Sequence, residues 1–407
     1  MSTPTAMLVM LIGASVLASV VLRAGCKRLG LPPLAGFILF GLLLRSLDAR
    51  WPYLSTEIMQ MFTLLGSLGI IALLFEVGLQ SHPRALAAKL PSATLIWICG
   101  VSTALVGGFV TSHWLLQLDL VPSMVIAVAL TATSVGVALA AWQEHGLLQS
   151  DDAEVLIDVA ELDDISGVAL MAMLLAVLPA LLAGNGGMAA VLGQSLLLFM
   201  VKFSSFVLFC LLLAYFVERP LTHWSQRLDA PPQRMLLVAG VGFLIAAFAE
   251  HLGFSLAIGA LFAGLVFSDD PDAVRTEASF QDLSALFTPF FFIGIGLHIN
   301  PAVLLDGLQL GVVLLLVAIA VKVLGHGLPA AWLRGRNSGL LLGVSMIPRA
   351  EIAMVILYQA QKLGPHVVPQ PVYAAMVMVT LATSTLTPLL LEPLLRRLTL
   401  SPTPARE

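Results

Sequence analysis

The chain has 407 residues, of which 59% are hydrophobic and only 11% are charged. Soluble domains carry about 25% charged residues, so the composition excludes an ordinary soluble protein and predicts an all-α polytopic membrane protein. The formal net charge is −4, and the loops contain no basic run, so neither nucleic acid nor an acidic partner is expected. The three cysteines are too widely spaced for a disulfide framework or a metal cluster, and no cofactor is expected.

Apolar windows of about 20 residues, which span the roughly 30 Å of hydrocarbon in a bilayer, predict about thirteen transmembrane helices. The boundary between the two helices near 250–253 is the least sharp. The first window lacks a basic region before it, so we interpret it as a retained helix and not as a signal peptide. The expected spans are 6–23, 31–46, 59–80, 91–112, 122–142, 155–182, 193–216, 234–250, 253–268, 283–299, 303–328, 339–361 and 370–395.

Lysine and arginine residues in the loops predict the orientation. With the N-terminus outside, three fall on the outer side: Arg45, Arg50 and Lys362. The inner side then holds Arg23, Lys27, Arg28, Arg84, Lys89, Arg219, Arg227, Arg234, Arg275, Arg334, Arg336, Arg396, Arg397 and Arg406. Because cytoplasmic loops are enriched in basic residues, we expect an outside N-terminus and a cytoplasmic C-terminus.

Two expected spans, 122–142 and 339–361, are interrupted by polar residues. The interrupting residues are Thr131, Thr133 and Ser134 in the first span, and Ser345, Pro348, Arg349 and Glu351 in the second. The spans are fifth and twelfth, so they cross the membrane in opposite directions, as do the paired broken helices of inverted-topology repeats that present half-helix ends to an ion. Either cluster alone fits a proline kink or hydroxyls bonded to helix carbonyls equally well. Both together favour a transport site.

The span 155–182 carries acidic side chains at bilayer depth. An ionised carboxylate there costs roughly 2.5 to 3.5 kcal/mol, so such residues are functional candidates. Asp158, Glu161 and Asp164 share one stripe of a helix, whereas Asp163 is turned about 100° away. We interpret the stripe as a cation funnel that opens to the cytoplasm and leads to Asp164. Asp158 and Glu161 fit equally well as hydrated residues at the inner interface.

The neighbouring Asp163 and Asp164 predict a site for protons and a transported monovalent cation. Burial and mutual repulsion favour the protonated form of one carboxyl group, so the pair can release protons at physiological pH. Two carboxylates also supply oxygen ligands for a small cation, together with hydroxyls and carbonyls of the broken helices. Mutually exclusive occupancy by protons and a cation is sufficient for coupled exchange.

Other charged residues lie in or beside the expected spans. Lys322 is about two-thirds of the way through its span, and we expect it to pair with Asp163; snorkelling toward the inner interface is the alternative. Arg349 and Glu351 are expected to form a structural ion pair or to brace the broken helix. Two roles for Glu76 are equally consistent with the sequence: it lines an ion path, or it caps the end of its helix.

At these residues the chain resembles the monovalent cation:proton antiporters, in the branch of bacterial sodium/proton antiporters and glutathione-gated potassium efflux systems. The resemblance covers almost the whole chain, and its segments follow in the same order. They are LPPLAGFILFGLLL (31–44), FAEHLGFSLAIGALFAGLVFS (248–268), FFFIGIGLHIN (290–300), Lys322 with Gly325, and IPRAEIA (347–353).

The resemblance implies one transmembrane domain over 1–397, with a short cytoplasmic tail at 398–407. Its core, about 91–182 and 303–397, would contain two crossed, discontinuous helices, and about 1–80 and 193–299 would form a dimerisation scaffold.

The resemblance also implies that Asp164 carries the cation and proton and that Asp163 partners Lys322. An Asp-Asp pair with that lysine is the pattern of electrogenic exchange in the family. Ala350 stands where the family often has glycine, and Asp158 and Glu161 stand where small apolar residues are common, a departure that bears on selectivity.

We therefore expect no enzyme, but a homodimeric secondary antiporter of the bacterial inner membrane that exchanges cytoplasmic Na⁺ or Li⁺ for external H⁺ by alternating access. Potassium/proton exchange and an organic-anion symporter on the same fold are the alternatives; a symporter would more commonly have a roomier polar cavity. An intramembrane aspartyl protease needs its aspartates on different helices, and a passive channel needs no titratable acid pair countered by a lysine.

Overall fold

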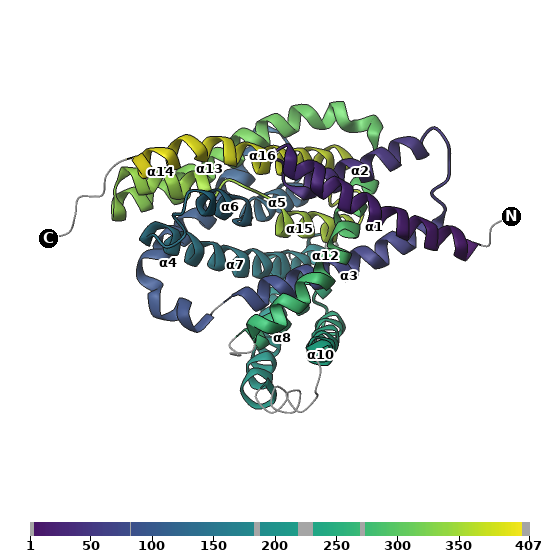
Figure 1. The fold of residues 1–407 in the computed structure, drawn as a ribbon, viewed down its shortest axis with the longest axis horizontal. Coiled ribbons are helices and arrows are strands. Elements are labelled where there is room, and N and C mark those ends of the chain that lie inside the picture. The colour runs from purple at the N-terminus through teal and green to yellow at the C-terminus, as the bar shows by residue number, and fades with distance from the viewer. Residues whose placement is uncertain (1–3, 82, 183–187, 219–230, 269–272, 401–407) are drawn as a thin grey trace. The chain divides into compact units, whose positions relative to one another are not determined.

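The computed structural model describes residues 4–81, 83–182, 188–218, 231–268 and 273–400, and these residues form helices without strands. The helices are α1 (Pro4–Arg28), α2 (Pro33–Asp48), α3 (Thr56–Gln80), α4 (Pro83–Val110), η1 (Thr111–Leu115), α5 (Leu120–Ala129), α6 (Gly136–Glu144), α7 (Asp151–Leu182), α8 (Met188–Leu213), η2 (Ala214–Glu218), α10 (Pro231–His251), α11 (Leu256–Phe267), α12 (Ala273–His298), η3 (Pro301–Val303), α13 (Leu304–Arg334), α14 (Arg336–Ser345), α15 (Glu351–Gln361) and α16 (Gln370–Leu400) (Figure 1).

The expected number of helical segments is confirmed in the described part of the chain. When α5 with α6 and α14 with α15 are each taken as one interrupted segment, and the short η elements as extensions of their neighbours, the described helices form thirteen segments. Eight described helices are long and apolar enough to cross a bilayer, and three further apolar helices are shorter. The chain is a multi-pass membrane protein. Much of the hydrophilic stretch 217–233 and of the tail 398–407 lies outside the described residues.

Local sequence signals set several helix ends. Ser55 and Ser255 are the N-caps of α3 and α11, and each hydroxyl accepts a hydrogen bond from a first-turn backbone N–H at 3.4 Å. The break near 250–253 is a turn, because α10 ends at His251 and Gly253 adopts a φ of 92° that an L side chain rarely adopts.

The chain forms two compact units. Unit 1 comprises Met1–Arg28, Pro33–Ala85 and Ala172–Pro301, and unit 2 comprises Leu29–Pro32, Leu86–Met171 and Ala302–Glu407. The long helix α7 contributes to both.

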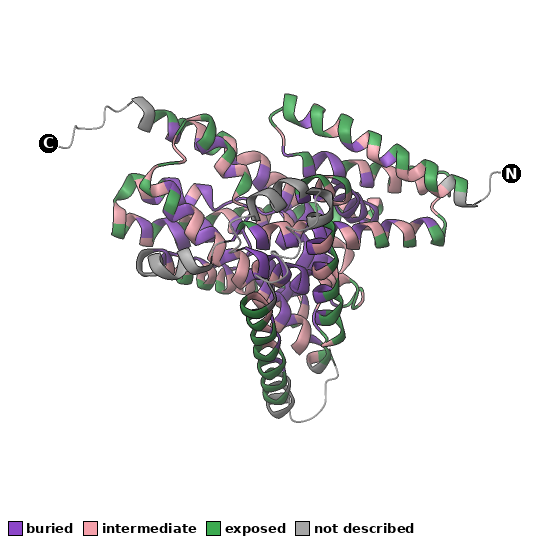
Figure 2. Ribbon diagram, turned by 60° about the horizontal axis from the view of Figure 1, so that its bottom comes forward, coloured by how far each residue is buried: buried purple, intermediate pink, exposed green. Residues whose placement is uncertain are grey.

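In unit 1, α3 packs against α11 and α12, and α2 packs against α12. Glycines allow these helices to approach main chain to main chain. A methyl group at Gly41 or Gly296 would overlap the backbone of the facing helix, and the same is true of Gly78 and Gly264. Small residues permit close helix contacts of this kind in membranes. By contrast, α1 is exposed along most of its length, as the green helix that leads to the N-terminus in Figure 2 shows.

In unit 2, α13 packs against α14 and α16, and α5 packs against α15. A buried apolar cluster that includes Trp142 joins α6 to α7 and α14. The indole N–H of Trp142 donates a hydrogen bond of 3.0 Å to the hydroxyl of Ser345, the last residue of α14. The second half of the first interrupted helix, α6, is therefore linked to the first half of the second, α14.

Candidate ion-binding site

The first interrupted helix breaks between α5 and α6, at residues 130–135. Thr131 and Ser134 are buried there, and the Thr131 hydroxyl donates a hydrogen bond of 2.7 Å to the carbonyl of Val128. Threonine and serine hydroxyls compete in this way with the helical hydrogen bonds of the main chain. The interruption predicted from this polar cluster is confirmed.

The second interrupted helix breaks between α14 and α15, at residues 346–350. Pro348 has no backbone N–H and disfavours a helical conformation in the residue before it. Ala350, which precedes α15, has φ −147° and ψ −99°, outside the helical region. Two α16 side chains hold the Arg349 backbone: the Thr383 hydroxyl accepts from its N–H at 3.2 Å, and the Ser384 hydroxyl donates to its carbonyl at 3.0 Å.

The two linkers contact each other directly. The backbone N–H of Ser134 donates to the carbonyl of Pro348 at 2.9 Å. In the other direction, Nη1 of Arg349 donates to the carbonyl of Ala132 at 2.8 Å. Arg349 forms no ion pair with Glu351 among the described residues, so its cation braces the opposite linker.

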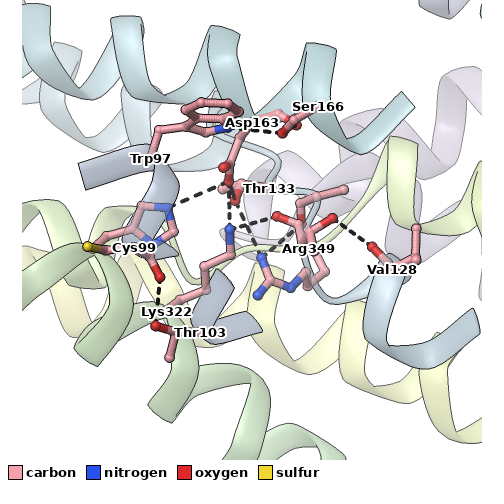
Figure 3. Close-up of polar contacts among 12 residues, drawn as sticks. Trp97, Cys99, Thr103, Val128, Thr133, Asp163, Ser166, Lys322 and Arg349 are labelled. Carbon is pink, nitrogen blue, oxygen red and sulfur yellow. Dashed lines mark hydrogen bonds and ion pairs between the residues drawn. The ribbon is translucent and has the colours of Figure 1, made fainter. Parts of the chain in front are cut away.

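Asp163 and Lys322 meet at this crossing, and both side chains are fully buried. Nζ of Lys322 lies 2.6 Å from Oδ2 of Asp163 and donates a second hydrogen bond of 2.7 Å to the carbonyl of Thr131. The hydroxyl of Thr133 donates to the same carboxylate oxygen at 2.6 Å. Figure 3 shows the Lys322 side chain directed at Asp163, with Thr133 and Arg349 beside them. The linker thus supplies both a carbonyl for the ammonium and a hydroxyl for the carboxylate.

The position of Asp163 is also fixed from α4. The indole N–H of Trp97 donates to the Ser166 hydroxyl at 3.0 Å, and that hydroxyl donates to the carbonyl of Asp163, also at 3.0 Å (Figure 3). Gly167 of α7 lies beside Ala132 in the linker, where a methyl group on the glycine would make an ordinary contact of 3.4 Å with the Ala132 side chain. These contacts orient α7 toward the crossing.

Asp164 has a different environment from Asp163. Its side chain is only partly buried, as are those of Asp158 and Glu161 on the same stripe of α7. The charges that act on Asp164 are those of Asp163, Glu351, Lys322 and Glu161. Glu351 is the first residue of α15 and is also partly buried. The acid pair therefore combines a fully buried residue with one that is only partly buried.

Glu76 belongs to unit 1 and is not among the residues that unit 2 brings together. It is partly buried on α3, where Gln80 donates a hydrogen bond of 3.5 Å to its carboxylate. Among the described residues, no group of three histidine, cysteine, aspartate or glutamate side chains is arranged to hold a resident metal ion.

His326 is a site residue that the sequence analysis missed. Its ring is fully buried, and Nε2 lies 3.7 Å from Oδ2 of Asp163. Space for the ring depends on Gly100 of α4, since a methyl group there would overlap it. The available signal was helical spacing: His326 follows Lys322 by four residues, which places both on one face of α13. Asp163 therefore faces two basic side chains of α13.

Comparison with known proteins places these features in a family. Residues 14–397 match the model described as sodium/hydrogen exchanger, transmembrane. The high-affinity Na⁺/H⁺ antiporter NhaS3 of Synechocystis is 27% identical over 305 residues, which cover 73% of this chain and 64% of that protein. The Na⁺/H⁺-K⁺ antiporter GerN of Bacillus cereus is 26% identical over 371 residues, which cover 90% of each chain. The structure of the sodium proton antiporter MjNhaP1 of Methanocaldococcus jannaschii superposes with a TM-score of 0.72 at 16% identity, over 98% of this chain and 100% of that one, and so shows the same fold.

Proposed function

We propose, from the premise that this chain belongs to the transmembrane sodium/hydrogen exchanger family, that it is a secondary antiporter that exchanges cytoplasmic Na⁺ or Li⁺ for external H⁺. The observation that carries the proposal is the buried ion pair of Asp163 and Lys322, 2.6 Å long, at the contact between two interrupted helices. Asp164 follows Asp163 in the chain and is the less buried of the two residues.

Asp164 is the residue to which we assign the transported ions. Asp163 is already neutralised by Lys322, whereas Asp164 is the less buried residue and has no ion pair with a basic side chain among the described residues. Oxygen atoms suit an alkali cation, and the Thr131 carbonyl and Thr133 hydroxyl lie on the linker beside the acid pair. Proton and cation then compete for one site, which couples their movements.

Lys322 carries the second proton in this proposal. A cation that draws Asp163 into its ligand set removes the carboxylate from the ammonium, and a buried ammonium without a counter-ion releases its proton readily. Rebinding of that proton restores the ion pair. Two protons exchanged for one monovalent cation move one net charge per cycle, worth about 2.3 kcal/mol per 100 mV of membrane potential.

Unit 2 is the proposed transport core, because it contains both interrupted helices and the acid pair. Unit 1 is the proposed scaffold, through which two copies form a homodimer. We infer a bacterial inner-membrane location from the bacterial origin of the relatives. The distribution of basic residues between loops supports an outside N-terminus and a cytoplasmic C-terminus.

Potassium is the alternative cargo. The name of the relative GerN includes K⁺ together with Na⁺. The three acidic residues Asp158, Glu161 and Asp164 along one face of α7 supply oxygen atoms without fixing a cavity size. An assay that titrates Na⁺, Li⁺ and K⁺ separately distinguishes these exchange reactions.

Purified protein in proteoliposomes with an internal pH dye tests the proposal. Addition of Na⁺ or Li⁺ is expected to dissipate an imposed pH gradient, and Asp164→Asn is expected to abolish this response. Asp306→Asn is a matched control, because Asp306 is an exposed carboxylate at the start of α13. Normal exchange by Asp164→Asn would overturn the site assignment, and ion flux without proton movement would overturn antiport.

A further inference from the structure

A groove of ≈ 570 Å³ lies in unit 1 between α1 and α12, and the ion exchange does not account for it. Its volume is in the range of sites that hold small organic ligands. The groove is lined by Val16, Ser19, Val20, Arg23, Ala24, Lys27, Asp282, Ala285 and Leu286.

The charged residues of the groove form a mixed set. Arg23 and Lys27 come from α1 and Asp282 from α12, and all three side chains are exposed. No ion pair among the described residues involves any of them. Two cations beside one carboxylate complement a ligand that carries both an anionic phosphate and a cationic hydrogen-bond donor.

Apolar and charged lining residues are separated along each helix, in opposite chain order on α1 and α12. On α1, Val16 and Val20 precede Arg23 and Lys27; on α12, Asp282 precedes Leu286 by about one turn. The distance along α1 from residue 16 to residue 27 is about 16 Å at 1.5 Å per residue. This length matches one leaflet, which is about half of the roughly 30 Å hydrocarbon thickness. The groove therefore has the polarity and the length of a single lipid molecule.

We propose that this groove binds a phospholipid whose headgroup combines a phosphate with a primary ammonium, as in phosphatidylethanolamine. Arg23 and Lys27 bind the phosphate, and the Asp282 carboxylate accepts hydrogen bonds from the ammonium. Val16, Val20 and Leu286 contact an acyl chain. Because α1 buries little of its surface within the chain, such a lipid covers a face of α1 that the protein itself leaves open (Figure 2).

Native mass spectrometry of the delipidated full-length protein, with defined lipids added back, tests this site. Phosphatidylethanolamine is expected to bind several-fold more tightly than phosphatidylcholine, because a quaternary ammonium cannot donate a hydrogen bond to Asp282. Asp282→Asn is expected to erase that preference. Arg23→Gln or Lys27→Gln is expected to weaken the binding of both lipids about fivefold, as loss of one basic contact near the surface predicts. Arg28→Gln is the matched control, since Arg28 is exposed and outside the groove.

Several results would overturn the proposal. Equal binding of the two lipids, or tighter binding of phosphatidylglycerol than of phosphatidylethanolamine, would show that the site does not recognise the ammonium. Displacement of the lipid by inorganic phosphate alone would show that the site recognises a free anion. Lipid-free dimers whose formation depends on Arg23 and Lys27 would show that a second copy fills the groove. The test compares the ratio of the affinities for the two lipids within each variant. A variant that is less stable therefore still gives a valid comparison.

Discussion

The two compact units are stabilised by different kinds of contact. In unit 1, Gly41 faces Gly296 and Gly78 faces Gly264, so helices meet main chain to main chain. The buried residues described there include no aspartate, glutamate, lysine or arginine. In unit 2, Asp163, Lys322 and Arg349 are fully buried at the crossing of two interrupted helices.

This difference separates a fixed contact from one that can change. Glycine contacts fix one spacing between helices, because neither partner has a side chain that can rearrange. A buried ion pair depends on both charges being present, and it is strongly destabilised when one partner is neutralised or removed. Unit 2 can therefore respond to the ions that it binds, whereas unit 1 offers them no comparable contact.

The largest expected effect comes from removing the cation of the buried pair. Lys322→Met leaves Asp163 uncompensated and is expected to lower the free energy of unfolding by about 3 to 5 kcal/mol. The double variant with Asp163→Leu is expected to recover most of the loss, because no unpaired charge remains buried. Unfolding in detergent measures both proteins. If the single variant is no less stable than the double variant, the ion pair is not what distinguishes unit 2.

A smaller effect is expected from crowding a glycine contact in unit 1. Gly296→Ala places a methyl group against the backbone of α2 and is expected to cost about 1 to 3 kcal/mol. The matched control is Gly294→Ala on the same helix, where a methyl group meets nothing within 4 Å. The sodium concentration for half-maximal exchange should be unchanged in Gly296→Ala. A change in it would mean that the division of roles between the units is wrong.

Removal of one hydrogen bond to the buried carboxylate should have a cost similar to that of the glycine substitution. Thr133→Val deletes the hydroxyl that donates to Asp163 and is expected to destabilise the protein by about 2 kcal/mol, typical of a hydrogen bond to a charged group. Thr385→Val is the control, because its hydroxyl bonds only to a carbonyl of its own helix. Thermal unfolding compares the two variants, and equal losses would contradict a special role for the linker hydroxyl.

The smallest effect on stability is expected at Asp48, the last residue of α2, which follows the apolar segment of that helix. The backbone N–H of Leu54, bonded to the carboxylate at 2.8 Å, lowers the pKa of Asp48, with smaller contributions from Tyr53 and Arg45. Because the folded pKa lies below the unfolded one, the carboxylate stabilises the fold above the unfolded pKa, and this contribution is lost as pH falls through the folded pKa. Asp48→Asn should cost about 1 kcal/mol at neutral pH.

The pH dependence of unfolding provides the check on Asp48. The difference in stability between the wild type and Asp48→Asn should narrow as the pH falls below the ordinary aspartate range. A difference that stays constant over that range would show that the charge of Asp48 contributes nothing, and that only the shape of the turn matters.

Much of this architecture was readable in the sequence, because apolar length and polar interruptions are local signals. The two broken helices and the turn before Gly253 follow from Thr131, Pro348 and the glycine itself. Contacts between distant segments carry no such signal. The bond from Arg349 to Ala132 joins residues 217 positions apart, and periodicity cannot choose between that partner and Glu351. Helical spacing places His326 on the same face of α13 as Lys322, but its burial against Gly100 of α4 is a distant contact that the spacing does not reveal.

The reciprocal bonds between the two linkers have a consequence for the order of events in a transport cycle. Ser134 bonds to Pro348 through main-chain atoms, while Arg349 returns a bond to Ala132. A displacement of either linker therefore strains its hydrogen bonds to the other linker. An intermediate in which only one half of the inverted pair has rearranged would break these bonds, so the geometry favours a concerted step over a sequential one.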